Sequence, residues 1–234
     1  MPKTVAIQGP GFTVGGMAKG AGMLAPGLAT MLVVLTTDAA VGSADLDAAL
    51  RAAVRVSFDR LDSDGAMSTN DTVLLLASGA SGVTPVQEAF TAVVTRACND
   101  LATQLMSDAE GATKEVAIEV VHAATEDEAV EVGRAVARNN LVKTALFGQD
   151  PNWGRILAAV GTTRAAFDPD QVDVAINGVW ICRGGAVGDD RSGVDLAPRA
   201  VHVRIDLHAG IETATVLTND LSHAYVHENS AYST

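Results

Sequence analysis

A lysine at position 19 is the first side chain whose surroundings suggest chemistry. It lies in the glycine-rich run GGMAKGAG, residues 15–22. Glycines allow a backbone to approach a ligand closely, and a lysine among them can present a positive charge to an anion. A solvated lysine in a flexible turn is the alternative, and this segment by itself leaves both open. The run lacks the spacing of a phosphate loop or of a dinucleotide-binding motif.

Two carboxylates and a threonine are the other candidates. Asp108 and Glu110 fall at the C-terminal end of a predicted helix, where the helix dipole disfavours negative charge. This placement indicates either a cationic partner from outside the helix or a solvated helix end. Thr30 interrupts an apolar run, which by itself indicates only a strand, because threonine is a good strand residue.

Composition narrows the class of protein. Hydrophobic residues make up 48% of the 234 residues, which is typical of a globular chain, and the net charge of −12 disfavours binding to nucleic acid or anionic membranes. The two cysteines, Cys98 and Cys182, do not suggest a disulfide framework. His223 and His227 lack a third ligand, so no metal site is expected. With no signal-peptide core and no membrane-length apolar run, a cytoplasmic location is expected.

The hydrophobic periodicity predicts an α/β or α+β fold, because strands alternate with helices. A capping box at Thr125 and Glu128 and a type I′ turn at Asn177-Gly178 are the clearest local signals. No periodicity is evident in the tail, residues 218–234. Strands are predicted at 3–8, 12–16, 31–35, 72–77, 116–121, 142–147, 172–176, 179–182 and, as a final pair, 201–207 and 213–217. Helices are predicted at 46–61, from an N-cap at Thr84 to 105, at 126–138 and at 151–160.

Five spaced segments carry a family resemblance. They are residues 15–38 (GGMAKGAGMLAPGLATMLVVLTTD), 68–72 (STNDT), 108–114 (DAEGATK), 141–161 (LVKTALFGQDPNWGRILAAVG) and 218–234 (TNDLSHAYVHENSAYST). Together they resemble the bifunctional ornithine acetyltransferase / glutamate N-acetyltransferase family of arginine biosynthesis, in the family's own order and along the whole chain.

The resemblance implies an enzyme that cleaves itself between Ala29 and Thr30 and then uses Thr30 as an N-terminal nucleophile. A free α-amine, with a pKa of roughly 7.7–8.0, is a suitable base for the threonine hydroxyl. Thr30 would take acetyl from N-acetylornithine and pass it to glutamate, without a metal or a prosthetic group, and acetyl-coenzyme A is a further candidate donor. The residues implied to line the substrate site are Lys19, Thr30, Glu110, Asn229 and Thr234.

The same resemblance implies the domain organisation. Residues 1–29 would end the α portion, and the β portion, or β chain after cleavage, would begin at Thr30. Within it, 30–113 would belong to a layered sheet-and-helix domain of the N-terminal-nucleophile type, and 114–234 would form a smaller C-terminal α/β domain whose tail returns to the active site. Family members carry a longer α portion with a Ser-Thr-Gly motif expected to form the oxyanion hole. That motif has no counterpart here, so the missing part of the α portion is the expected partner, in an α2β2 heterotetramer. A related self-processing aminopeptidase or amidase and an inactive fragment are the alternatives.

Overall fold

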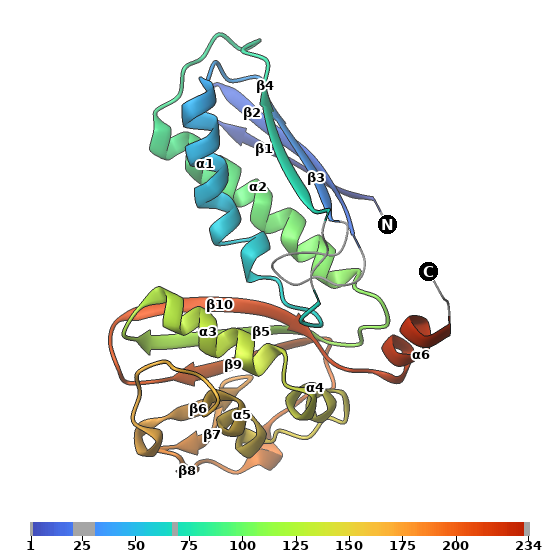
Figure 1. Ribbon diagram of the computed structural model, residues 1–234, viewed down its shortest axis with the longest axis vertical. Coiled ribbons are helices and arrows are strands. Elements are labelled where there is room, and N and C mark those ends of the chain that lie inside the picture. The colour runs from blue at the N-terminus through green and yellow to red at the C-terminus, as the bar shows by residue number, and fades with distance from the viewer. Residues whose placement is uncertain (1, 21–30, 67–69, 232–234) are drawn as a thin grey trace. The chain divides into compact units, whose positions relative to one another are not determined.

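The protein is described by a computed structural model that covers residues 2–20, 31–66 and 70–231 (Figure 1). The chain divides into two compact units, one formed by Met1–Leu61 with Gly65–Ala109 and the other by Asp62–Asp64 with Glu110–Thr234. Each unit combines a sheet with helices, which confirms the predicted α/β class. No helix of the described ranges is long and apolar enough to cross a membrane.

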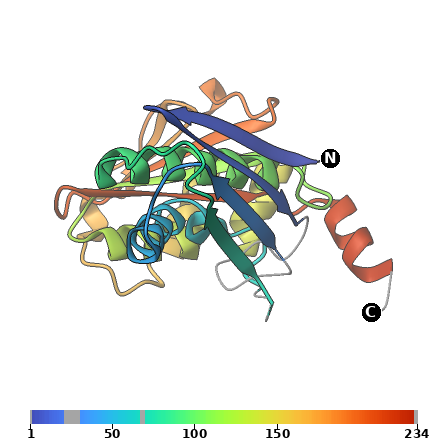
Figure 2. The same cartoon turned by 90° about the horizontal axis from the view of Figure 1, so that it is seen from above.

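The first unit is built on a four-stranded sheet in the order β1-β2-β3-β4, whose strands lie side by side in Figure 2. β1 and β2, both predicted as strands, form an antiparallel hairpin, and Gly11 in its turn has a φ of 79°, which favours glycine. β3 pairs antiparallel with β2 and parallel with β4. The strands are β1 (Lys3–Gly9), β2 (Phe12–Lys19), β3 (Leu32–Thr37) and β4 (Thr72–Ala77).

Helices α1 (Ser43–Arg55) and α2 (Gln87–Ser107) cover one face of this sheet, with the short 3-10 helix η1 (Phe58–Arg60) after α1 (Figure 1). Phe12 of β2 meets Phe90 of α2 with ring centroids 5.8 Å apart. The N-cap predicted at Thr84 is wrong. Val86 has an extended backbone (φ −65°, ψ 137°), so α2 begins only at Gln87 and has no side-chain cap.

The C-terminal end of α2 has a cationic partner within its own unit. Asp108 caps α2, and one of its carboxylate oxygens lies 2.6 Å from the Lys3 ammonium of β1. The hydrogen bond from Lys3 holds the pKa of Asp108 below its usual range. For Asp108, the cationic partner suggested by the helix-end position is therefore Lys3.

The second unit is built on a six-stranded sheet in the order β10-β5-β9-β6-β7-β8. β5 and β9 are parallel, and β5 lies between β9 and β10, so the expectation that the last two long strands pair with each other is wrong. Asn177 and Gly178 both have positive φ, as the predicted type I′ turn requires. The strands are β5 (Glu115–Ala123), β6 (Asp173–Ile176), β7 (Val179–Arg183), β8 (Ala186–Val187), β9 (Ala200–Asp206) and β10 (Glu212–Asn219).

Helix α3 (Glu126–Ala137) packs closely on this sheet. Thr125 accepts the N–H of Glu128 at 3.2 Å, which confirms the predicted cap. A Cβ atom at Gly133 would lie 2.7 Å from a methyl carbon of Val216, so glycine is needed for this close approach of α3 to β10. The remaining helices are α4 (Asn140–Phe147), α5 (Trp153–Val160), α6 (His223–Ala231) and the 3-10 helices η2 (Pro169–Gln171) and η3 (Arg191–Gly193).

The strand predicted at 142–147 is wrong, because this segment forms α4. Asn139 caps the helix by accepting the N–H groups of Leu141 and Val142. Val142 and Leu146, four residues apart, are both buried in the core of the second unit. A short apolar run fits either a strand or a buried helix, and here the Asn cap and the i, i+4 burial decide for the helix.

α4 also carries a buried lysine. Lys143 donates to the Ser63 carbonyl at 2.7 Å, to the Thr218 hydroxyl at 3.1 Å and to the Asn219 carbonyl. Burial lowers the pKa of Lys143 to about 8, although the negative charge of Asp220 and of other nearby carboxylates opposes the shift. Lys143 therefore joins residues 62–64 and the end of β10 to α4. Burying its ammonium group costs free energy of desolvation.

We expect Lys143 to make the free energy of unfolding rise between pH 8 and 10.5. Its pKa is about 8 in the folded protein and near 10.5 in an unfolded chain, so in this range the unfolded state binds more protons and rising pH favours folding. The gain is up to about 3 kcal/mol. Urea unfolding across this range should therefore give a more positive pH slope of the free energy of unfolding in the wild type than in Lys143→Met. The raised pKa values of Cys98 and Tyr225 act in the opposite direction and are shared by both proteins, so equal pH slopes would contradict the assignment.

Candidate active site

In the first unit, the residue that follows the predicted nucleophile has both its backbone N–H and its backbone carbonyl hydrogen-bonded. Thr30 and Ala29 lie outside the described residues, and Met31 is the first residue described after them. The N–H of Met31 donates to Oδ1 of Asp71 at 2.5 Å, and its carbonyl accepts the N–H of Thr72 at 3.0 Å. The amide held by Asp71 is the one that joins Met31 to Thr30.

Asp71 has an unusual environment for a carboxylate. Its Oδ2 atom is buried and, among the described residues, has no hydrogen-bond partner. Burial raises the pKa of Asp71, and the hydrogen bond from Met31 opposes the shift only in part. No role was predicted for this residue, although it lies in the STNDT segment. A carboxylate directly before an apolar strand is the one sequence signal that marks it.

Lys19 lies at the same end of the first sheet as Met31 and Asp71. It is the last residue of β2, it is exposed, and its register partner on β3 is Leu32. Side chains directly opposite each other in an antiparallel pair have Cβ atoms about 4.5–5.5 Å apart. The first unit therefore brings Lys19 to the edge where β3 and β4 begin, close along the sheet to Met31 and Asp71.

In the second unit, two of the resembling segments are bonded to each other. The Asp220 carboxylate accepts the N–H groups of Thr113 and Lys114, both at 2.8 Å. The side-chain amide of Asn219 donates to the Lys114 carbonyl at 2.9 Å. The start of the C-terminal segment is thereby fixed beside the turn that carries Glu110.

Helix α6 begins at this junction. Ser222 donates its hydroxyl proton to the Gly111 carbonyl and accepts the N–H of Tyr225 at 3.0 Å, as an N-cap does. The Tyr225 hydroxyl donates to a carboxylate oxygen of Asp64 at 3.2 Å. Burial raises the pKa of Tyr225 to about 12, with further contributions from the negative charges of Asp64 and Glu110. Glu110 is therefore within electrostatic reach of the first turn of α6.

Asn229, the other predicted site residue of this unit, lies one turn further along α6. Its side chain is exposed, and its amide donates to the Tyr225 carbonyl at 2.9 Å. The second unit thus connects Glu110 to the helix that carries Asn229, through Gly111 and Tyr225. Thr234 lies outside the described residues.

We expect Gly111→Ala to displace α6. Gly111 has a φ of 66°, and a Cβ atom there would lie 2.2 Å from the backbone nitrogen of Tyr225. A backbone cannot yield as a flexible side chain does, so the free energy of unfolding should fall by about 2 kcal/mol or more. Gly178→Ala is the matched control, since Gly178 also has a positive φ but no atom within 4 Å of its Cβ position. Urea unfolding and amide exchange of α6 measure both effects, and equal losses in the two variants would contradict the close packing.

Comparison with known proteins places these residues in a family. The ArgJ family profile matches residues 1–234. The arginine biosynthesis bifunctional protein ArgJ of Streptomyces avermitilis is 68% identical over 231 residues, covering 99% of this chain and 60% of the relative. The protein of the same name from Mycobacterium leprae is 56% identical over 234 residues, covering 100% of this chain and 58% of the relative. The chain therefore spans about three fifths of the length of these relatives.

A solved structure is also similar. The crystal structure of arginine biosynthesis bifunctional protein ArgJ from Bacillus halodurans matches with a TM-score of 0.78 and 32% sequence identity. The match covers 86% of this chain and 98% of that one. Since the family profile matches the whole chain and the relatives share more than half of their aligned residues with it, this protein belongs to the ArgJ family.

Proposed function

We propose that this chain contributes the nucleophile of an acetyltransferase that moves acetyl from N-acetylornithine to glutamate. The proposal rests on two hydrogen bonds of Met31: its N–H donates to Asp71, and its carbonyl accepts the N–H of Thr72. A nucleophile at a new chain end gains rate from a fixed position, because catalysis depends on the alignment of the reacting atoms. The two hydrogen bonds of Met31 support a fixed position for its neighbour, Thr30.

Self-cleavage would use the Thr30 hydroxyl. Its oxygen attacks the Ala29 carbonyl carbon, the Ala29–Thr30 C–N bond breaks, and the nitrogen takes up the hydroxyl proton. Water then hydrolyses the resulting ester, which leaves a carboxylate on Ala29 and a free α-amine on Thr30. An α-amine titrates near pH 8, so a useful fraction is neutral and can act as the base for the hydroxyl beside it.

Turnover would be a double displacement. The Thr30 oxygen attacks the acetyl carbon of N-acetylornithine while the α-amine takes the hydroxyl proton and returns it to the departing amine of ornithine. The α-amine of glutamate then attacks the acetyl-Thr30 ester, which gives N-acetylglutamate and free Thr30. Splitting the transfer into two acyl-exchange steps is the usual function of a covalent nucleophile. Acetyl-coenzyme A is a further candidate donor for the first step.

The remaining predicted residues would bind the substrates. Lys19 is exposed at the sheet edge where β3 begins, and Glu110 lies beside the first turn of α6. A lysine and a carboxylate suit amino-acid substrates, which carry both charges. We assign Asn229 and Thr234 to the same site on the basis of the family resemblance.

An exposed apolar surface supports an α portion as partner. On the face of the first sheet opposite α1 and α2, Met17, Leu74 and Leu76 are 62%, 47% and 54% exposed. Met17 and Leu74 flank Val34 in the strand register, so these apolar side chains are contiguous. Contiguous exposed apolar surface marks an interaction site. We propose that the α portion covers this face, in an α2β2 assembly.

The proposal is tested by supplying the chain with the α portion of the Streptomyces avermitilis relative and labelled N-acetylornithine. Formation of labelled N-acetylglutamate, dependent on glutamate, is the expected result. Release of labelled acetate at a rate that glutamate does not change would instead indicate a self-processing amidase. An intact Ala29–Thr30 bond with no label transferred would indicate an inactive fragment.

A further inference from the structure

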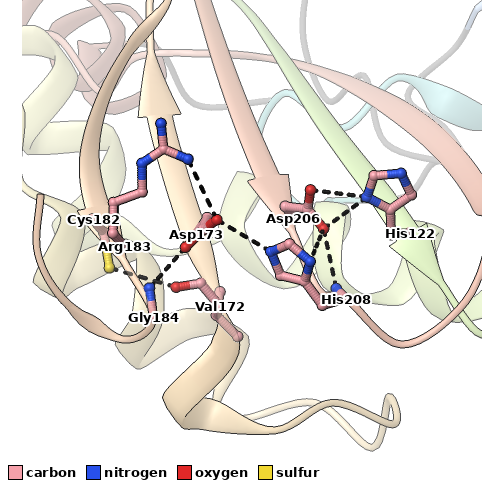
Figure 3. A network of polar contacts seen from close by, with 8 residues as sticks. All are labelled: His122, Val172, Asp173, Cys182, Arg183, Gly184, Asp206 and His208. Carbon is pink, nitrogen blue, oxygen red and sulfur yellow. Dashed lines mark hydrogen bonds and ion pairs between the residues drawn. The ribbon is translucent and has the colours of Figure 1, made fainter.

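Three side chains in the second unit converge away from the residues discussed above. His122 is the penultimate residue of β5, Asp206 ends β9, and His208 follows in the next loop. One possible ligand atom from each lies within 4.8 Å of the others. Figure 3 shows both imidazole rings turned toward the Asp206 carboxylate. The parallel register of β5 and β9, in which Val121 pairs with Asp206, brings them together.

The backbone on both sides of this cluster holds the two histidines. His122 and His208 have φ values of 52° and 50°, in the left-handed region that residues other than glycine seldom adopt. The His122 carbonyl accepts the N–H groups of both Ala209 and Gly210 at 2.8 Å. This pair of bonds ties the loop that carries His208 to the end of β5, so the two imidazoles stay on the same side of the sheet end.

The carboxylate at the centre is buried, whereas both imidazoles are half exposed. Nδ1 of His122 lies 2.9 and 2.8 Å from the two oxygens of Asp206, and Nδ1 of His208 lies 3.5 Å from Oδ1. Ligand atoms around a tetrahedral zinc ion are roughly 3.3 Å apart, from metal–ligand distances of about 2.0–2.2 Å. The three atoms lie within 4.8 Å of one another, so the two half-exposed rings would turn to bring them to this spacing around one cation.

A second carboxylate orients His208 from the far side of its ring. Nε2 of His208 lies 3.1 Å from Oδ2 of Asp173, whose other oxygen accepts the N–H of Gly184 at 2.7 Å. Arg183 lies 3.6 Å from the same carboxylate. An ionised carboxylate only accepts, so Nε2 donates its proton to Asp173, and Nδ1, on the Asp206 side of the ring, is the atom available to a cation. A carboxylate on the outer nitrogen is the usual companion of a metal-binding histidine.

We propose that His122, Asp206 and His208 bind a divalent transition-metal cation of the zinc class. Two imidazoles and one carboxylate favour such a cation over magnesium or calcium, which prefer oxygen ligands. Three protein ligands with half-exposed imidazoles leave a further position open to a small molecule or water. For Nδ1 of His122 to bind the cation, the ring proton on that atom must move to Nε2, so the cation binds the other tautomer of the neutral imidazole. The site is independent of the chemistry proposed for Thr30.

The test is a titration of the tag-free chain with zinc chloride at neutral pH by calorimetry, with magnesium chloride as the comparison. We expect one zinc ion per chain and no saturable heat from magnesium. His122→Asn and His208→Asn should each weaken zinc binding at least tenfold, since asparagine tolerates the left-handed backbone but supplies no imidazole. Asp173→Asn should weaken it about 10- to 100-fold through the orientation of His208.

His202→Ala is the matched control, because His202 is another half-exposed histidine on β9 that faces a single carboxylate, Glu119, at 3.3 Å. Its zinc affinity should equal that of the wild type. Thermal unfolding without metal shows whether each variant folds, and added zinc should raise the melting temperature of the wild type but not of the double variant His122→Asn/His208→Asn. Zinc binding of unchanged affinity in that folded double variant, or the lack of stoichiometric binding in the wild type, would overturn the proposal.

Discussion

Thr30→Ala is expected to leave the chain uncut and to abolish acetyl transfer. The variant lacks the hydroxyl that would attack both the Ala29 carbonyl and the acetyl donor, and without cleavage no α-amine is freed to act as the base. Loss of a catalytic nucleophile lowers the rate by a factor on the order of 10⁴ or more. Intact mass measures cleavage, and labelled N-acetylornithine measures transfer, both in the presence of the α portion.

Two variants serve as controls for this expectation. Thr30→Ser keeps a hydroxyl and should still be cleaved, whereas Thr36→Ala removes an exposed threonine from β3 and should leave cleavage and transfer unchanged. Transfer at the wild-type rate by Thr30→Ala would rule out Thr30 as the nucleophile.

Asp71→Ala is expected to slow both cleavage and transfer by about 10²-fold, which is the loss that a displacement of about 1 Å can cause. Asp71 accepts the N–H of Met31 through one oxygen, and its other oxygen is buried. Alanine removes the acceptor and leaves the Met31 amide without this partner. We treat Asp71 as a positioning residue for Thr30. The rate of chain cleavage, followed by intact mass, and the rate of transfer are the two measurements.

The conservative variant separates positioning from charge. Asp71→Asn retains a carbonyl oxygen that can accept the Met31 N–H and should recover most of the rate, whereas a loss as large as that of Asp71→Ala would show that the negative charge, not the hydrogen bond, is required. Asp47→Ala, which removes an exposed aspartate of α1, is the surface control and should behave as the wild type. Thermal unfolding of each variant shows whether a lost rate reflects lost structure.

Some local signals in the sequence predicted local structure, although the cap signal at Thr84 and the strand signal at 142–147 did not. The N-cap at Thr125 and the Asn177-Gly178 turn depend on residues close in sequence, and both are confirmed. Helix α6 could not be predicted in this way, since none of its side chains is buried and no apolar stripe marks it. The contacts of its first turn, the Ser222 cap and the close approach to Gly111, connect residues more than a hundred positions apart.

The candidate site likewise contains residues that the sequence could indicate and residues that only the fold brings together. Thr30, Lys19, Glu110, Asn229 and Thr234 could be named because family motifs mark them. Asp71 could not, because its role depends on the parallel pairing of β3 with β4, which brings residue 71 beside residue 31. The cluster of His122 and Asp206 likewise depends on strand register between residues 84 positions apart, and no spacing in the sequence reports it.

Thr30 as the covalent acceptor is tested most directly by the mass of the β chain after brief incubation with N-acetylornithine in the absence of glutamate. We predict that the peptide beginning at Thr30 gains the mass of one acetyl group and loses it when glutamate is added. A chain that transfers acetyl to glutamate without ever carrying it on that peptide, or that carries it on a different residue, would contradict the proposed mechanism.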